Sequence, residues 1–127
     1  MKKLLPIIII NVLLCTQALA EWSFVTTLQD GKGTKVYIDP ETLTKDSNYS
    51  YIWKLDDLKV PYQGTKSAAM HLQIDCNSMR AKILQYVFYT DQMGTGKPTS
   101  FVKDRIEWKA YPPGANMHNI IKGVCSY

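Results

Sequence analysis

The chain has 127 residues, of which 46% are hydrophobic and 11% aromatic, and its formal net charge is +4 at pH 7. This length suits one domain with a hydrophobic core of its own. Acidic and basic residues are interleaved without a basic run or stripe, and this distribution argues against nucleic acid as a partner.

The start of the chain has the three parts of a secretory signal peptide. Two lysines precede an apolar run over residues 4–14, and Ala18-Leu19-Ala20 places small residues before a cleavage site. An apolar run of about 11 residues is shorter than the roughly 20 that span a bilayer. We therefore predict that residues 1–20 are removed and that residues 21–127 form one exported domain without stable insertion in a membrane. Its expected location is the periplasm, with the outer membrane or cell surface as the alternative.

Only two of the three cysteines, Cys76 and Cys125, lie in the predicted exported domain. Cys15 lies within the signal, and the bulky Leu14 stands where a lipoprotein signal needs a small residue. Two thiols in an oxidising compartment favour one disulfide. A bond between Cys76 and Cys125 leaves neither thiol for metal binding or nucleophilic catalysis.

The exported domain is predicted as a succession of short strands followed by one helix. Runs of β-prone residues between turn residues predict strands over residues 22–27, 34–38, 48–58, 67–76, 82–89 and 105–111. Between the second and third runs, Asp39 suits a helix cap and Pro40 the first helical position, so we expect a helical turn over residues 41–43. The sequence Pro112-Pro113-Gly114 breaks the last strand and forces a new start.

The last segment has the period of a helix. Met117, Ile120, Ile121 and Val124 follow the i, i+3, i+4, i+7 spacing of one helical face, with Cys125 at its edge. A helix of about eleven residues is not stable alone in water, so it must pack on the sheet.

The fourth predicted strand shows where that helix packs. Its residues alternate between an apolar face (Ala68, Met70, Leu72, Ile74, Cys76) and an opposite face (Ala69, His71, Gln73, Asp75). A bond from Cys76 to Cys125 lays the helix across the apolar face. We predict an α+β fold, in which an antiparallel sheet of about six strands carries one C-terminal helix tethered by a disulfide.

Two motifs that suggest catalysis do not have the required geometry. Asp56 and Asp57 are adjacent on a predicted strand, so their carboxylates point to opposite faces and do not share a proton. Residues 94–97 resemble part of a phosphate-binding loop but lack its first glycine and its final serine or threonine. A carboxylate dyad and a nucleotide site are therefore not expected.

The two histidines, His71 and His118, are not spaced as metal ligands with any cysteine or with each other. We predict no enzymatic activity, no metal and no cofactor. Burial of His71 beside Asp75 in a deep pocket is the arrangement that would favour an enzyme.

Aromatic residues gather on the predicted strands. Tyr49, Tyr51 and Trp53 share one strand face, as core residues usually do, but a helix on one side of the sheet can leave such rings exposed for binding. Arg80 and Lys82 add positive charge at a hairpin, where an ordinary solvated turn is the alternative. The candidate binding surface consists of Tyr49, Tyr51, Arg80 and Lys82.

Ordered motifs over nearly the whole exported domain resemble the surface-adhesin protein E family of small exported bacterial proteins. The motif residues are Glu21-Trp22, Val36-Tyr37-Ile38-Asp39-Pro40, Thr42, Trp53, Asp57, Pro61, Ser67, Asp75-Cys76, Arg80, Tyr89, Met93-Gly94, Gly96, Trp108, Pro112-Pro113-Gly114 and Val124-Cys125. No single motif is specific, whereas their order and spacing are.

The resemblance implies a sheet with a disulfide-tethered helix and a non-enzymatic binding function. The namesake of the family is an outer-membrane lipoprotein that binds host extracellular-matrix and plasminogen-system proteins, whereas the signal of this chain departs from a lipoprotein signal at Leu14. The implied function is therefore protein–protein binding, with host proteins as expected partners. The alternative is a soluble periplasmic accessory, inhibitor or envelope-maintenance protein with a bacterial partner. The sequence leaves open whether the domain acts alone or as a homodimer.

Overall fold

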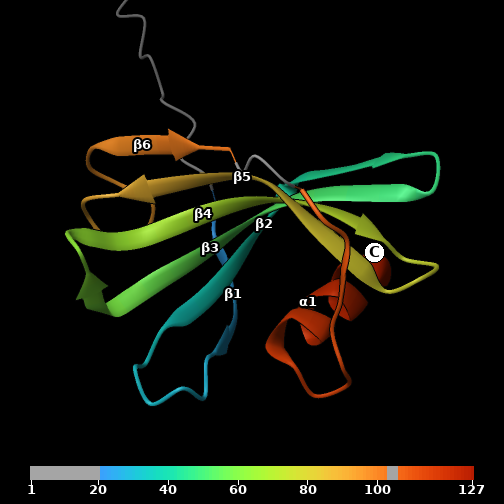
Figure 1. The fold of residues 1–127 in the computed structure, drawn as a ribbon, viewed down its shortest axis with the longest axis horizontal. Helices are drawn as coiled ribbons and strands as arrows, with labels where there is room; N and C mark the ends of the chain where they lie inside the picture. The colour runs from blue at the N-terminus through green and yellow to red at the C-terminus, as the bar shows by residue number, and fades with distance from the viewer. Residues whose placement is uncertain (1–20, 103–105) are drawn as a thin grey trace, which may run out of the picture.

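The computed structural model describes residues 21–102 and 106–127, and the predicted signal in residues 1–20 lies outside them. An antiparallel sheet in sequence order carries one C-terminal helix, which confirms the predicted fold class (Figure 1). The elements are β1 (Ser23–Thr27), β2 (Lys35–Asp46), β3 (Tyr49–Tyr62), β4 (Thr65–Asp75), β5 (Arg80–Tyr89), β6 (Pro98–Phe101), β7 (Lys109–Ala110) and α1 (Asn116–Cys125). The short β7 pairs with β5 beyond the main path of the sheet.

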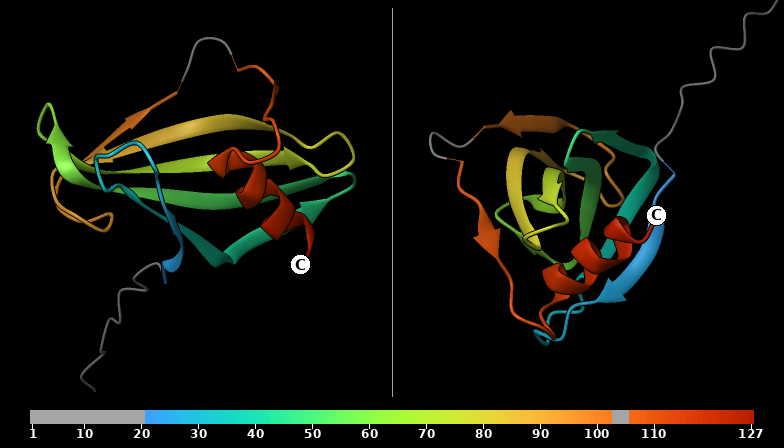
Figure 2. Two further views of the ribbon diagram at one scale, coloured as in Figure 1. Left: turned by 90° about the horizontal axis from the view of Figure 1, so that it is seen from below. Right: turned by 90° about the vertical axis from the view of Figure 1, so that its right-hand side faces the viewer.

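Helix α1 lies across one half of the sheet, which is twisted and curled around it (Figure 2). Its buried residues Ile120, Ile121 and Val124 belong to the same core cluster as Leu72 and Ile74 of β4. The remaining buried members of this cluster are Val36, Ile52, Met70 and Ala81. The predicted helical stripe and the predicted apolar face of the fourth strand are thus confirmed as the two sides of one core.

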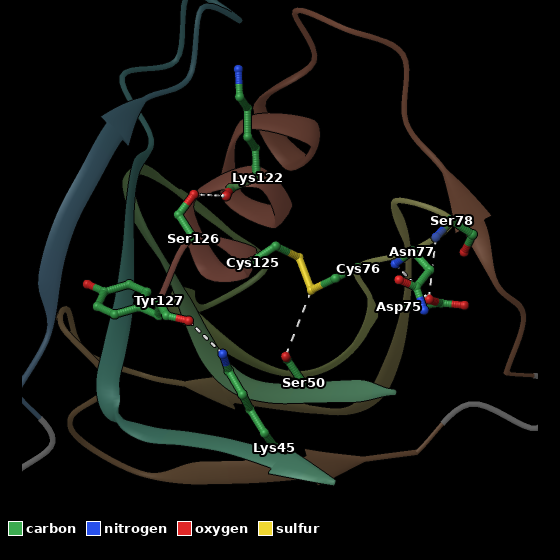
Figure 3. Close-up of a disulfide and its surroundings, with 10 residues drawn as sticks. All are labelled: Lys45, Ser50, Asp75, Cys76, Asn77, Ser78, Lys122, Cys125, Ser126 and Tyr127. Atoms are coloured by element: carbon green, nitrogen blue, oxygen red, sulfur yellow. Dashed lines mark hydrogen bonds between the residues drawn. A yellow bond between two sulfur atoms is a disulfide. The ribbon is translucent and has the colours of Figure 1, made fainter. Parts of the chain in front are cut away.

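The disulfide joins the residue after β4 to the end of α1 (Figure 3). The sulfur atoms of Cys76 and Cys125 are bonded at 2.08 Å, and their Cα atoms are 5.7 Å apart. A second link lies nearby, where the Lys45 Nζ donates a hydrogen bond of 2.6 Å to the carbonyl oxygen of Tyr127. The predicted disulfide is confirmed, and it tethers the helix at its C-terminal end.

The helical turn predicted over residues 41–43 is wrong, because β2 continues through this segment. The strand pairs with β3 both before and after it, at Asp39 and again at Thr44, with a shift of register between them. Asp39 does cap locally, since its Oδ1 accepts a hydrogen bond of 3.2 Å from the Glu41 N–H. Strand pairing on both sides therefore turns the expected helical turn into a bulge of the strand.

The sixth strand predicted over residues 105–111 is also wrong in its extent. Residue 105 lies outside the described residues, and only Lys109–Ala110 pairs with β5. The reason is that β6 already pairs with β5 from Tyr86 to Tyr89. The last strand is thereby confined to the other end of β5.

A second, smaller core lies on the face of the sheet opposite α1, called here the outer face. Leu55, Ala69 and Val87 are buried there. Partly buried side chains that cover them come from five positions, namely Trp22, Tyr37, Trp53, Tyr89 and Met93. The predicted alternation is confirmed, since Ala69 lies opposite the face of Met70 and Leu72, and residues before β1 and after β5 bury it there.

Candidate functional site

The outer face brings together the four residues of the predicted binding surface. Tyr51 lies opposite Gln73, which lies opposite Lys82, and Tyr49 lies one row further along the strands. In that row Asp75 stands between Tyr49 and Arg80. The four predicted residues thus occupy two neighbouring rows across β3, β4 and β5, although their role in binding stays a prediction.

Stacked rings extend these rows along β3. The indole of Trp53 stacks on the imidazole of His71, with centroids 4.8 Å apart and an interplanar angle of 7°. The ring of Tyr51 lies 6.2 Å from the same imidazole, and its hydroxyl accepts a hydrogen bond of 3.2 Å from Gln73 Nε2. All four side chains are half-buried, so each is held in place while part of it faces solvent.

Trp108, which lies in the segment before β7, adds one more ring to these stacked rings. Its ring stacks on Tyr49 with centroids 5.5 Å apart, and the Lys82 ammonium lies 4.4 Å from the ring centroid. That distance is within the roughly 6 Å at which a cation is attracted to an aromatic face. We call Tyr49, Tyr51, Trp53, His71 and Trp108 the aromatic face. The sequence did not predict that Trp108 joins it, because no local pattern brings residue 108 to β3.

No hydrogen bond joins His71 to Asp75, the pairing that would favour an enzyme, in the part of the chain that the structure describes. Desolvation by burial lowers the pKa of His71 from its ordinary value of 6.5. Asp75 is engaged elsewhere, because its Oδ1 accepts hydrogen bonds from the N–H groups of Asn77 and Ser78, at 3.0 and 3.4 Å. His118 lies apart, with its Nδ1 3.0 Å from the carbonyl oxygen of Tyr111. The described residues contain no group of three or more His, Cys, Asp or Glu that could hold a metal ion.

The adjacent carboxylates Asp56 and Asp57 serve separate structural roles on opposite faces, as predicted. Asp56 forms an ion pair of 2.9 Å with Lys54. Asp57 Oδ1 accepts a hydrogen bond of 2.7 Å from the Met93 N–H, and Ser67 Oγ accepts one of 2.9 Å from the Gly94 N–H. Asp57 and Ser67 thus fix the loop after β5 to the sheet.

A cavity of about 230 Å³, called here the aromatic pocket, lies beside the aromatic face and shares Trp53 with it. Its lining residues are Trp22, Asp39, Thr42, Trp53, Ala69 and Tyr89. These residues come from the segment before β1 and from β2, β3, β4 and β5. Sequence reasoning did not predict this pocket, because its walls are far apart in the chain.

A family model described as surface-adhesin protein E matches residues 22–126 of the chain. The chain belongs to the surface-adhesin protein E family. No curated protein matches it in sequence. The membership supports an exported, surface-associated protein, and no described helix is long and apolar enough to cross a membrane.

Solved structures of protein E from Haemophilus influenzae have a similar fold. The selenomethionine form has a TM-score of 0.66 at 13% identity, over 81% of this chain and 85% of that chain. A second crystal form has a TM-score of 0.64 at 15% identity, over 81% and 87%. Protein E from a non-typeable strain has a TM-score of 0.60 at 15% identity, over 81% and 75%. At identities of 13% and 15%, this similarity is evidence for a shared fold alone.

Several motif residues that carried the family resemblance meet at the aromatic pocket. Trp22, Asp39, Thr42, Trp53 and Tyr89 line it. Two others, Asp57 and Ser67, hold the neighbouring loop. Motif residues that are far apart in the sequence are therefore neighbours in the folded domain.

Proposed function

We propose that this family member is an exported, non-enzymatic binding protein that contacts a protein partner through its aromatic face. The observation that supports this proposal is that the rings share the outer face of the sheet, opposite the core that packs against α1. Tyrosine, tryptophan and arginine dominate the energetics of protein–protein interfaces. Tyr49, Tyr51 and Trp108 belong to the aromatic face, and the exposed Arg80 lies beside it in the row of Tyr49.

The rings are ordered before any partner arrives. Tyr49 stacks on Trp108, and Tyr51 accepts a hydrogen bond from Gln73. Immobilising a free side chain on binding costs about 0.5–1.5 kcal/mol, so rings that are already held lose less entropy in a complex. Preorganisation of this kind favours a binding role for the face.

The charge beside the rings favours an acidic partner surface. Arg80 is exposed, and its guanidinium can make two parallel hydrogen bonds to one carboxylate. Lys82 adds a second positive charge, although its ammonium also lies over Trp108. Host extracellular-matrix and plasminogen-system proteins are the partners that the family resemblance suggests, and an envelope protein is the alternative.

The double variant Tyr49→Ala/Tyr51→Ala tests the face. We expect it to bind at least about tenfold more weakly than the parent chain, because loss of an interface hot spot costs about 2 kcal/mol or more. Binding is measured by biolayer interferometry against immobilised matrix proteins, plasminogen and periplasmic extract. Tyr62→Ala is the matched control, since Tyr62 lies on the same strand and is 68% exposed. Equal binding by the double variant and the parent chain would contradict the proposal.

Protease treatment of intact cells separates the two classes of partner. Digestion of the protein on intact cells is expected for a surface adhesin. A protein that resists the protease and is released by osmotic shock belongs instead to the periplasm, where a bacterial partner is the one to seek.

A further inference from the structure

The aromatic pocket has the size of a small chemical group. Its volume of about 230 Å³ lies below the roughly 300–1,000 Å³ of pockets that hold drug-sized ligands. A headgroup or one long side chain suits such a space.

Three aromatic side chains form walls of the pocket. Trp22, Trp53 and Tyr89 are each half-buried. His71 covers one face of the Trp53 indole, and none of the three rings stacks on another. Each wall therefore keeps ring surface for a ligand, and aromatic faces attract cations within about 6 Å.

A buried acid lies in the same pocket. Asp39 is only 4% exposed, and its Oδ1 accepts a single hydrogen bond of 3.2 Å, from the Glu41 N–H. A carboxylate offers about four acceptor positions, so most of them remain for another donor. Among the described residues no lysine or arginine pairs with Asp39, whereas the acid on the other face, Asp56, has Lys54 at 2.9 Å.

We propose that the aromatic pocket binds an organic cation, with an ammonium or guanidinium group between the rings and beside the Asp39 carboxylate. Buried charges are as a rule paired, and the pocket places the Asp39 carboxylate beside three aromatic walls. The same chemistry is found in a lysine or arginine side chain of a partner protein and in a free quaternary amine. The site shares Trp53 with the aromatic face but includes neither Tyr49 nor Tyr51, and it adds a ligand class that the proposed function does not name.

The three tryptophans of the chain provide a direct test. The exported chain is titrated with choline, and in parallel with 3,3-dimethylbutan-1-ol, its uncharged isostere, while indole N–H signals are followed by NMR. We expect choline to shift the signals of Trp22 and Trp53 saturably in the millimolar range. The signal of Trp108, which stacks on Tyr49, is expected to stay in place, and the uncharged isostere to give no saturable shift.

Asp39→Asn separates the charge of this residue from its structural role. Asparagine keeps an acceptor oxygen for the Glu41 N–H, and we expect choline affinity to fall about tenfold or more, because the substitution removes the charge–charge attraction between the carboxylate and the quaternary ammonium. Asp30→Asn is the matched control, since Asp30 Oδ1 likewise accepts the N–H two residues on, at 2.9 Å, but lies outside the pocket. Trp22→Leu is a second test, because Trp22 lies outside any strand. We expect it to weaken choline binding and to leave the hydrogen bond from the Glu41 N–H to Asp39 unchanged.

N-acetyl-lysine amide and N-acetyl-arginine amide distinguish the two sources of the cation. Binding of either amide assigns the pocket to a partner side chain, and binding of choline alone assigns it to a free amine. Absence of saturable shifts with every cation, equal shifts with the uncharged isostere, or unchanged affinity in Asp39→Asn would each overturn the proposal. Such a failure would leave the interferometry result at Tyr49 and Tyr51 standing, so the two proposals fail separately.

Discussion

Gly96 shows how closely single residues are constrained in the loop that follows β5. Its φ is +85°, in the left-handed region that favours glycine, and a Cβ there would lie 2.5 Å from both Thr90 Oγ1 and Asp91 Oδ2. Gly31 has a similar φ of +77°, but a Cβ at that position would have no atom within 4 Å. The two glycines therefore differ in steric room rather than in backbone conformation.

Alanine at these two positions should separate the two effects. We expect Gly31→Ala to cost about 1 kcal/mol, the strain of a left-handed residue, and Gly96→Ala to cost about 1 kcal/mol more, because Thr90 Oγ1 must move away from the Lys97 N–H whose hydrogen bond it accepts. Thermal unfolding measures both, at about 4–8 °C per kcal/mol for a domain near this size. Equal melting temperatures would contradict the steric account.

His71 predicts a dependence of stability on pH. Burial lowers its pKa in the folded state, whereas the unfolded chain has the ordinary value of 6.5. As pH falls below about 6.5, the unfolded state binds a proton that the folded state does not yet bind, so the free energy of unfolding decreases. Urea unfolding at a series of pH values should therefore show that the free energy of unfolding decreases less toward acid pH in His71→Gln than in the parent chain. His118→Gln, which leaves His71 in place, is the matched control. If the free energy of unfolding decreases equally toward acid pH in all three chains, His71 is not the source of the pH dependence.

At the scale of elements, α1 depends on the sheet for its stability. A helix of ten residues is marginal alone, and here it combines three buried side chains with one covalent tether. The helix has no side-chain cap at its N-terminus, so packing and the disulfide are what hold it.

Removal of the tether should therefore be costly. Cys125→Ser opens a loop of 49 residues, for which the loss of chain-entropy stabilisation is about 4 kcal/mol. We expect the melting temperature to fall by more than about 10 °C under oxidising conditions. The double variant Cys76→Ser/Cys125→Ser is the control for the unpaired thiol, and it should melt near the single variant. A melting curve equal to that of the parent chain would mean that the bond adds nothing.

Elements defined by local periodicity could be predicted from the sequence, and elements defined by distant partners could not. The stripe from Met117 to Val124 and the alternation from Met70 to Ile74 each identify a face within a few residues, so the helix-to-sheet packing followed. Trp108 reaches Tyr49 only because β7 returns to β5, and no pattern near residue 108 indicates that return. The aromatic pocket likewise depends on how five separate segments meet.

At the scale of the whole molecule, one sheet is shared by two cores. Leu72 is buried on the side of α1 and Leu55 on the outer face, and β3 and β4 contribute to both. Neither core is therefore expected to unfold without the other.

Matched variants test this cooperativity. Leu55→Ala and Leu72→Ala should each cost about 2–5 kcal/mol, because each removes a fully buried leucine. In both variants, tryptophan fluorescence and far-ultraviolet circular dichroism should report one common transition. An earlier fluorescence transition in Leu55→Ala would instead show that the outer core melts on its own.

If the predicted signal directs export, the spacing of Cys76 and Cys125 has a consequence for the timing of secretion. An exported chain crosses its membrane in order, so the thiol of Cys76 must wait until 49 more residues have followed it. During that interval the described domain holds no other cysteine with which it could mispair. The bond can form only after residue 125 has crossed the membrane. An oxidised molecule is therefore one in which the chain has been translocated as far as the end of α1. A gel-shift assay for free thiols would therefore follow translocation as well as folding.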